Sequence, residues 1–231
     1  MLKRKYLFSL SAFFIFIHAF SVCADADLIN SSLIEVPSAP SSKNFICIFY
    51  SGDGGWVKID REMTRVFTDN GIPCIGIDSR KYFKQKRQPE EFTGDLEALT
   101  HHYLIQWNKQ KIILMGFSRG ADILPFALNR LSPDLKNKIE LVVLLGPEKR
   151  ISFQSHLLDL VLILPSSADT LVSPEIARIK GYNLLCIFGK KEKDSPCTEL
   201  SNTQKIEVPG KHHFEKKYRE LAELVLRKIP S

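Results

Sequence analysis

One pentapeptide, Gly116-Phe117-Ser118-Arg119-Gly120, constrains the fold of this chain more than any other sequence feature. The apolar run 111–115 comes directly before it, and a helical pattern begins directly after it. A G-x-S-x-G turn between a strand and a helix is too tight for side chains at its flanking positions, which explains both glycines. Such a turn exposes the serine hydroxyl at the end of the strand and leaves the next N–H group able to bind an oxyanion. We therefore expect Ser118 to be a nucleophile.

Apolar runs alternate with amphipathic segments along the rest of the chain. The pattern predicts strands at 33–36, 45–50, 72–78, 112–117, 139–145, 184–189 and 205–208, and helices at 58–70, 90–107, 121–131 and 214–228. This alternation implies right-handed crossovers and a mostly parallel central sheet with helices on both faces. With the serine turn, the order predicts the α/β class and the α/β-hydrolase fold. Residues 44–231 are enough for one sizeable domain and too few for two ordinary ones.

The first 24 residues have the pattern of a cleaved secretory signal peptide. Basic residues at 3–5 precede an apolar stretch at 6–20, and small residues follow at 21–26. Cleavage after Ala24 fits best, and cleavage after Ala26 is the alternative. The branched Val22 before Cys23 disfavours a lipid-modified cysteine. Residues 25–43 are polar, rich in Ser and Pro, and lead into the domain with one edge strand at 33–36.

The charge of the mature chain is mildly positive. Residues 1–24 contain three basic residues and no acidic one, so the formal net charge of +6 falls to +3 without them. This excess is compatible with contact to an anionic membrane surface, and it is too small to argue for nucleic-acid binding.

The cysteines give no metal-binding pattern, because none has zinc-finger spacing. Export permits disulfides, and we predict one between Cys186 and Cys197 that pins the intervening loop. Cys47 and Cys74 fall in two predicted core strands, where small buried thiols are expected.

A serine nucleophile needs a base, and the base needs an acid to orient it. In this fold the chain order is serine, then acid, then histidine. The acid predicted here is Asp194, which follows the strand at 184–189, and Glu192 is the alternative. The base predicted here is His213, after the last strand, and His212 is the alternative.

The oxyanion hole needs two N–H groups aimed at the developing charge. One should be the backbone N–H of Arg119. The other should come from the Gly-rich loop 51–56, from Asp53 or Gly54, because glycine lets the backbone approach a substrate closely. Asp122 is expected to cap the helix that follows the serine.

The segment 151–174 interrupts the alternation of strands and helices. It holds the apolar run 157–164 and falls where lids insert in α/β-hydrolases. It is either a small apolar lid that meets acyl chains or a membrane surface, or an ordinary buried segment.

Several stretches together resemble the VirJ family of bacterial virulence proteins and the related C-terminal domain of AcvB. They are 50–56, 76–83, 116–126, 189–197 and 209–214, and the resemblance extends over about residues 44–228. It implies a periplasmic protein associated with type IV secretion. AcvB-like members are linked to hydrolysis of aminoacylated phosphatidylglycerol such as lysyl-phosphatidylglycerol, so the resemblance implies the same reaction class here. The chain lacks the long N-terminal extension of AcvB and is similar to the short VirJ form.

The sequence thus predicts a periplasmic serine hydrolase that cleaves an ester, with Ser118, His213 and Asp194 as the triad. No metal or organic cofactor is expected. The expected partners are a lipid ester or other small ester, a membrane surface and components of type IV secretion, with no nucleic acid. The alternatives are a non-catalytic periplasmic adaptor or chaperone for type IV secretion, and a generic carboxylesterase or thioesterase.

Overall fold

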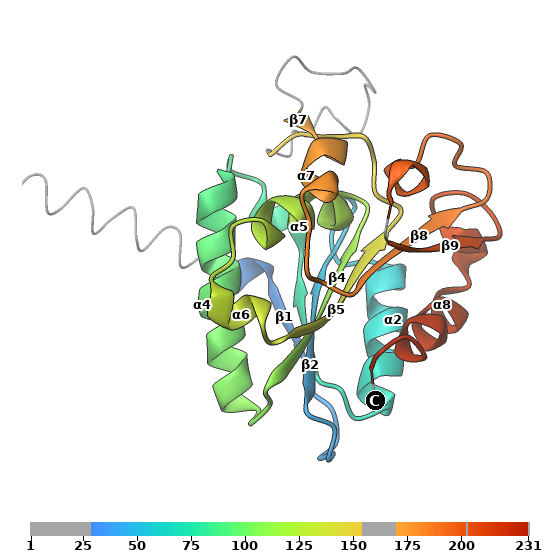
Figure 1. Cartoon of the computed structure of the whole chain (residues 1–231). Coiled ribbons are helices and arrows are strands. Elements are labelled where there is room, and N and C mark those ends of the chain that lie inside the picture. The colour runs from blue at the N-terminus through green and yellow to red at the C-terminus, as the bar shows by residue number, and fades with distance from the viewer. Residues whose placement is uncertain (1–28, 154–169, 202, 231) are drawn as a thin grey trace, which may run out of the picture.

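A seven-stranded sheet lies at the centre of the molecule (Figure 1). The computed structural model describes residues 29–153, 170–201 and 203–230. The strand order in the sheet is β1-β3-β2-β4-β5-β8-β9. The bounds are β1 Leu33–Val36, β2 Phe45–Tyr50, β3 Cys74–Ile77, β4 Lys111–Phe117, β5 Ile139–Leu145, β8 Leu184–Gly189 and β9 Gln204–Val208. All neighbours pair in parallel except β1, which runs antiparallel to β3 at the edge of the sheet, where an edge strand was expected.

Helices cover both faces of this sheet, as predicted for the fold class (Figure 1). Helices α4 (Pro89–Gln106) and α5 (Arg119–Leu128) lie on one face, and α2 (Lys58–Asp69) and α8 (Tyr218–Leu226) lie on the other. The described residues also contain short helical turns, among them α3 Ser79–Tyr82, α6 Pro133–Lys136, α7 Ser173–Ala177, η1 Pro196–Glu199 and η2 Phe214–Lys216.

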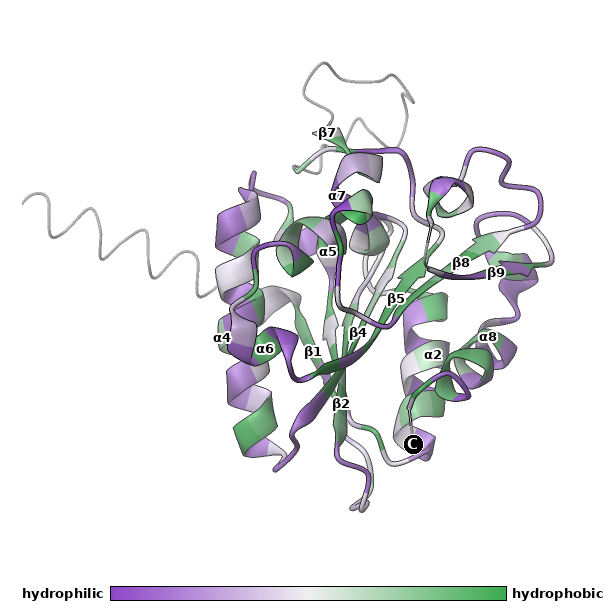
Figure 2. Ribbon diagram, viewed as in Figure 1, coloured by the Kyte–Doolittle hydropathy of each residue, from purple (hydrophilic) through white to green (hydrophobic). Residues whose placement is uncertain are grey.

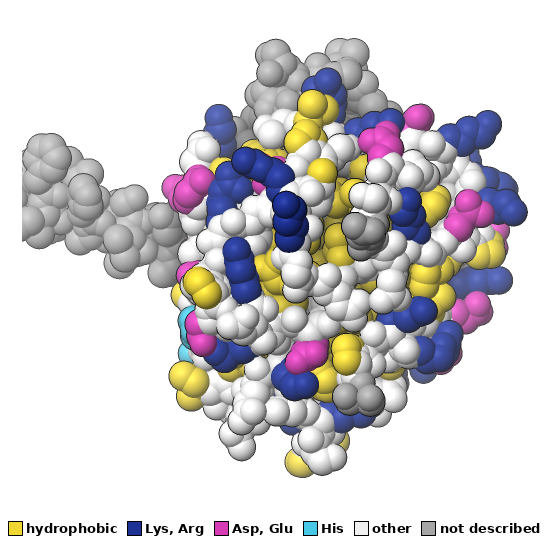
Figure 3. Space-filling view, viewed as in Figure 1, with side chains coloured by type: hydrophobic (Ala, Val, Ile, Leu, Met, Phe, Trp, Pro, Cys, Tyr) yellow, Lys and Arg dark blue, Asp and Glu magenta, His cyan; other side chains and the backbone are white. Residues whose placement is uncertain are grey.

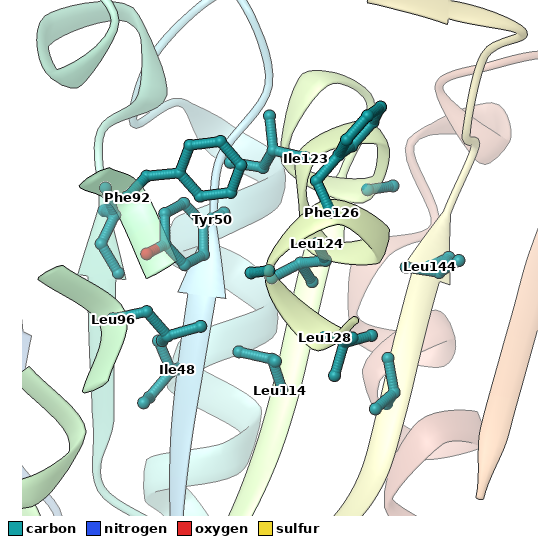
Figure 4. Close-up of a cluster of buried hydrophobic side chains, with 14 of the residues drawn as sticks. Ile48, Tyr50, Phe92, Leu96, Leu114, Ile123, Leu124, Phe126, Leu128 and Leu144 are labelled. Atoms are coloured by element: carbon teal, nitrogen blue, oxygen red, sulfur yellow. The ribbon is translucent and has the colours of Figure 1, made fainter. Parts of the chain in front are cut away.

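Successive residues of the central strands enter two separate hydrophobic clusters. In β2, Ile46 and Ile48 pack toward α4 and α5, whereas Cys47 and Phe49 pack toward α2 and α8. Both sets are buried because both faces are covered, so the strands read as continuous apolar runs in the sequence. Figure 2 shows the resulting apolar strands between helices with polar outer surfaces. Figure 4 shows the cluster that α4 and α5 form with β2, β4 and β5.

The C-terminal helix begins later than the sequence pattern predicts. The expected helix at 214–228 is divided into the short turn η2 and helix α8. Phe214, Glu215 and Lys216 have φ values of 49°, 52° and 61°, in the left-handed region that ordinary residues seldom adopt. A continuous right-handed helix therefore starts only at Tyr218.

Two predictions made from the sequence fall wholly or partly outside the described residues. The signal peptide at 1–24 lies outside them, and so do residues 154–169 of the proposed lid. The two described ends of the lid segment pair as the short antiparallel strands β6 (Arg150–Ile151) and β7 (Thr170–Leu171). Among the described residues, no helix has both the length and the apolar character needed to cross a membrane.

Candidate active site

Ser118 occupies a strained turn between β4 and α5. Its φ of 51° and ψ of −121° are unusual for a residue with a side chain, and strain of this kind clusters at functional sites. The Ser118 N–H donates to the carbonyl of Leu145 at 2.9 Å, which ties the turn to the end of the neighbouring strand β5. This is the geometry that the G-x-S-x-G pattern predicts.

Both glycines of the turn are required by close backbone contacts. A Cβ atom on Gly116 would lie 2.3 Å from the backbone of Gly120. A Cβ atom on Gly120 would lie 2.1 Å from the carbonyl oxygen of Tyr50, at the end of β2. Helix α5 can therefore begin directly against the sheet only because these positions lack side chains.

Glu192 and His212 form the acid–base pair that the structure brings together. The Nδ1–H group of His212 donates to Oε1 of Glu192 at 2.9 Å. The other carboxylate oxygen, Oε2, accepts from the N–H of Gly189 at 2.5 Å, at the end of β8. Both carboxylate oxygens are thus held, and the bond to Glu192 uses only Nδ1 of the imidazole.

Asp194 and His213, the pair preferred from the sequence, do not meet in the structure. The turn 189–192, closed by the Glu192 N–H on the Gly189 carbonyl at 2.8 Å, directs the Glu192 side chain back to the strand end. Asp194 follows this turn, so its side chain is 95% exposed, and its carboxylate lies 3.9 Å from Nζ of Lys149. The geometry therefore supports the alternatives, Glu192 and His212.

His213 lies beside His212 but is exposed. The rings of the two histidines are 5.6 Å apart, and both lie near the ring of Phe117, at 5.1 Å for His212 and 5.8 Å for His213. Both histidines thus lie close to the residue before the nucleophile, and only His212 has a carboxylate partner among the hydrogen bonds of the described residues.

The electrostatic environment distinguishes the two histidines. Burial by itself lowers the pKa of His212, but the hydrogen bond and negative charge of Glu192 outweigh burial and raise it above its ordinary value. Burial lowers the pKa of His213, and the nearby charges of His212 and Lys216 lower it further. Burial would raise the pKa of Glu192, but its bonds to His212 and Gly189 hold it below the usual range. His212 and Glu192 thus stabilise each other as an ion pair.

Gly146 leaves space for the pair of Glu192 and His212. The sequence patterns did not reveal this role of Gly146. Its φ is 56°, and a Cβ atom there would lie 3.0 Å from Nδ1 of His212. A side chain at this position would press on the hydrogen bond to Glu192. The signal in the sequence is a glycine directly after β5.

The Gly-rich loop 51–56 lies against the serine turn. Its Gly52 packs on Ser118, because a Cβ atom there would lie 3.2 Å from the Cβ of the serine. The N–H of Gly55 donates to the carbonyl of Gly52 at 3.0 Å, which closes a turn with Asp53 and Gly54 at its centre. In the described part of the chain, the N–H groups of Asp53 and Gly54 donate to no backbone carbonyl. These groups suit the second oxyanion donor, as the sequence predicts.

The side chain of Arg119 is almost buried beneath this loop. It forms an ion pair with the carboxylate of Asp53 and donates to the carbonyl of Ser152. Asp122, expected as a helix cap, instead accepts from the N–H of Glu148 at 2.7 Å. Burial raises the pKa of Asp122 well above its usual range.

Cys186 and Cys197 form the disulfide expected from the sequence. The bond joins β8 to η1 and closes the loop that contains Glu192. Cys47 and Cys74 are free and buried, opposite each other on β2 and β3. No cluster of three or more His, Cys, Asp or Glu side chains suited to a metal ion occurs in the described ranges.

Comparisons with known proteins identify a family for this chain. The family model described as bacterial virulence protein (VirJ) matches residues 44–231. No curated protein sequence matches the chain.

Solved structures show the same fold at low sequence identity. Est1E from Butyrivibrio proteoclasticus with ferulic acid bound is similar with a TM-score of 0.60 and 11% identity, over 84% of this chain and 93% of that chain. Proline iminopeptidase from Mycobacterium smegmatis has a TM-score of 0.61 and 10% identity, over 84% and 92%. An alpha-beta serine hydrolase homologue from Coxiella burnetii has a TM-score of 0.60 and 15% identity, over 86% and 91%. The chain therefore has the α/β-hydrolase fold.

Proposed function

Since the chain belongs to the VirJ family of bacterial virulence proteins, we propose that it is a serine hydrolase that cleaves a carboxylic ester. The observation that carries this proposal is that three loops meet at the carboxyl ends of the parallel strands. Ser118 follows β4, Glu192 follows β8 and His212 follows β9, in the chain order that the fold requires. Glu192 already orients the imidazole through Nδ1.

The chemistry follows from these positions. The Ser118 hydroxyl attacks the ester carbonyl while Nε2 of His212 takes its proton. The oxyanion formed is stabilised by the N–H of Arg119 and by that of Asp53 or Gly54. His212 then gives the proton to the departing alcohol, which leaves an acyl-serine. Water attacks this ester with the same base, releasing the acid and the free serine.

We propose an aminoacyl ester of phosphatidylglycerol as the substrate class, in the periplasm, as the family resemblance implies. The negative charges of Glu148 and Asp53 raise the pKa of His212, and the exposed carboxylate of Glu148 suits an ammonium group of a lysyl ester. The turns around the pair carry exposed lysines, and Figure 3 shows Lys and Arg side chains along the molecular edge beside β8 and β9. This arrangement suits an anionic lipid surface.

The test begins with the serine itself. Mature protein and its Ser118→Ala variant are treated with a fluorophosphonate probe, and we expect labelling of the wild type alone. Both proteins are then given lysyl-phosphatidylglycerol in mixed micelles, and we expect release of lysine by the wild type only.

Three other outcomes would change the assignment. Cleavage of short acyl esters with lysyl-phosphatidylglycerol left intact indicates a generic carboxylesterase. Failure of a folded wild type to react contradicts the hydrolase. Type IV secretion that is supported equally by Ser118→Ala and wild-type protein favours the adaptor.

A further inference from the structure

Arg119 contacts three separate segments around the nucleophile with one buried guanidinium group. Its side chain is 7% exposed. Nε donates to the carboxylate of Asp53 in the Gly-rich loop, and Nη1 donates to the carbonyl of Ser152, just after β6. The guanidinium carbon lies 6.0 Å from the centre of the Phe83 ring. Burying a guanidinium group costs desolvation free energy, so packing alone does not account for a buried arginine at this position.

In the described part of the chain, the backbone bond from Gly55 to Gly52 closes the loop that Arg119 contacts, and the side chains around the centre of the loop make few other contacts. Its first part is fixed, because Ser51 donates its N–H to Ile77 at 3.0 Å and its Oγ accepts from the N–H of Ser79 at 2.9 Å. Its central Gly54 has space around it among the described residues, since a Cβ atom there would meet only Val57 of these residues, at 3.7 Å. Within the described ranges, the Asp53 carboxylate therefore provides a side-chain link between the centre of the loop and helix α5.

The two oxyanion donors come from different elements and must point at one oxygen atom. The N–H of Arg119 is placed by the first turn of α5, and the N–H of Asp53 or Gly54 is placed by the loop. Electrostatic stabilisation of an oxyanion depends on donors held within about 0.5 Å of the productive geometry.

We propose that the ion pair between Arg119 and Asp53 is the positioning element of the oxyanion hole. The residue whose backbone supplies one donor uses its own side chain to hold the loop that supplies the other. Arg119 and Asp53 thus act through their side chains as positioning residues. This inference rests on the proposed hydrolase activity and goes beyond it, because neither side chain takes part in the bond-making steps.

The experiment compares Arg119→Met, Asp53→Asn and the double variant on a soluble acyl ester. The assays are run at alkaline pH, where His212 is neutral in every variant. Under this condition, loss of the Asp53 charge cannot change kcat by shifting the pKa of His212. We expect each single variant to lower kcat by about 10- to 100-fold with KM changed little, since loss of a whole donor costs about 10²- to 10³-fold. We expect the double variant to be no worse than the poorer single variant, because the two side chains act as one unit.

Two further measurements separate positioning from folding. The fluorophosphonate probe should react more slowly with the variants but label the same final fraction of protein as in the wild type. Arg119→Lys keeps the charge and should restore part of kcat. Arg130→Met is the matched control, because Arg130 forms a 2.9 Å ion pair with Glu90 away from the serine, and it should keep wild-type kcat.

The outcomes distinguish this inference from the proposed function. Variants with wild-type kcat, or additive losses in the double variant, overturn the positioning role while leaving the hydrolase in place. A reduced labelled fraction with unchanged kcat per labelled site assigns the ion pair to stability and also overturns it. A wild type that never reacts contradicts the hydrolase and this inference together.

Discussion

Among the side chains near His212, Glu192 has the largest effect on its protonation and its tautomer. It accepts from the imidazole with one oxygen and from the backbone of Gly189 with the other. The carboxylate therefore fixes the tautomer and the orientation of the ring, and it stabilises the imidazolium that forms during attack.

We predict that Glu192→Gln lowers kcat by about 10³-fold or more, because the amide no longer stabilises the imidazolium. The pH profile should change as well. Glu192 raises the pKa of His212, so activity in the wild type rises as pH increases through a pKa above the ordinary histidine value. Without the charge this pKa falls, and the acid limb of kcat/KM should move to lower pH. Steady-state rates across pH measure both effects.

Asp194→Asn is the matched control for this experiment. Its side chain is almost fully exposed and lies near Lys149, so the variant should keep activity and pH profile close to the wild type. A large loss of kcat in Asp194→Asn with little change in Glu192→Gln would show that Asp194, and not Glu192, is the acid of the triad.

At the scale of elements, the start of α5 decides the shape of the site. Gly120 lets the helix approach the carbonyl of Tyr50 at the end of β2, and Gly52 packs on Ser118 from the loop that follows β2. Close contact between backbones therefore sets the start of the helix, and the first part of the oxyanion loop packs on the side chains of Phe117 and Ser118.

We predict that Gly120→Ala destabilises the protein by about 1–3 kcal/mol or more, because the added methyl group overlaps backbone that cannot easily move. Chemical denaturation monitored by fluorescence measures this change. Gly94→Ala in α4 is the control, since a Cβ atom there meets none of the described residues within 4 Å, and the substitution should stabilise the protein by about 0.5–1 kcal/mol. Equal stability of Gly120→Ala and the wild type would contradict the close approach.

The elements themselves could be predicted from the sequence, because both faces of the sheet are buried and each central strand is a continuous apolar run. Strand β2 was predicted with its observed bounds, and the nucleophile turn was recognised from its glycines. The C-terminal helix was predicted as well, but its start was placed too early, because that start depends on three left-handed residues that no pattern marks.

The sequence narrowed the acid and the base to neighbouring candidates, but the pair it preferred, Asp194 and His213, is not the hydrogen-bonded pair of the structure. Glu192 and Asp194 differ by two positions in a tight turn, and the choice depends on a hydrogen bond from Gly189 to the carboxylate. The side-chain contacts of Arg119 span segments 66 and 33 residues apart, so no local pattern could reveal them.

At the scale of the whole molecule, charge is distributed unevenly around the site. Six exposed lysines lie on the two turns after β8 and β9, at Lys190, Lys191, Lys193, Lys211, Lys216 and Lys217. The turns are adjacent, because Lys191 donates its N–H to the carbonyl of Gly210 at 2.9 Å. We refer to these six residues as the lysine rim.

We predict that the lysine rim attracts vesicles that contain phosphatidylglycerol. Ser118→Ala protein should sediment with such vesicles and not with neutral phosphatidylcholine vesicles, and added salt should weaken the binding. Changing Lys190, Lys191 and Lys193 to Gln should weaken it by about 10- to 100-fold, at up to about 1 kcal/mol per charge near the surface.

The control is a second triple variant that removes three positive charges at the opposite end of the sheet. Lys43 precedes β2, and Arg227 and Lys228 follow α8, so changing these three residues to Gln should leave vesicle binding nearly intact. Equal weakening by both triple variants would show that net charge alone governs binding and would contradict a role for the rim.

The hydrogen bond between His212 and Glu192 also has an evolutionary consequence. The two residues lie 20 positions apart, and each stabilises the charged form of the other, so neither can be replaced alone without loss. Among descendants that keep the chemistry, positions 192 and 212 should be inherited as a pair. Positions 194 and 213 should drift, and a lineage that abandons catalysis should lose the pair together.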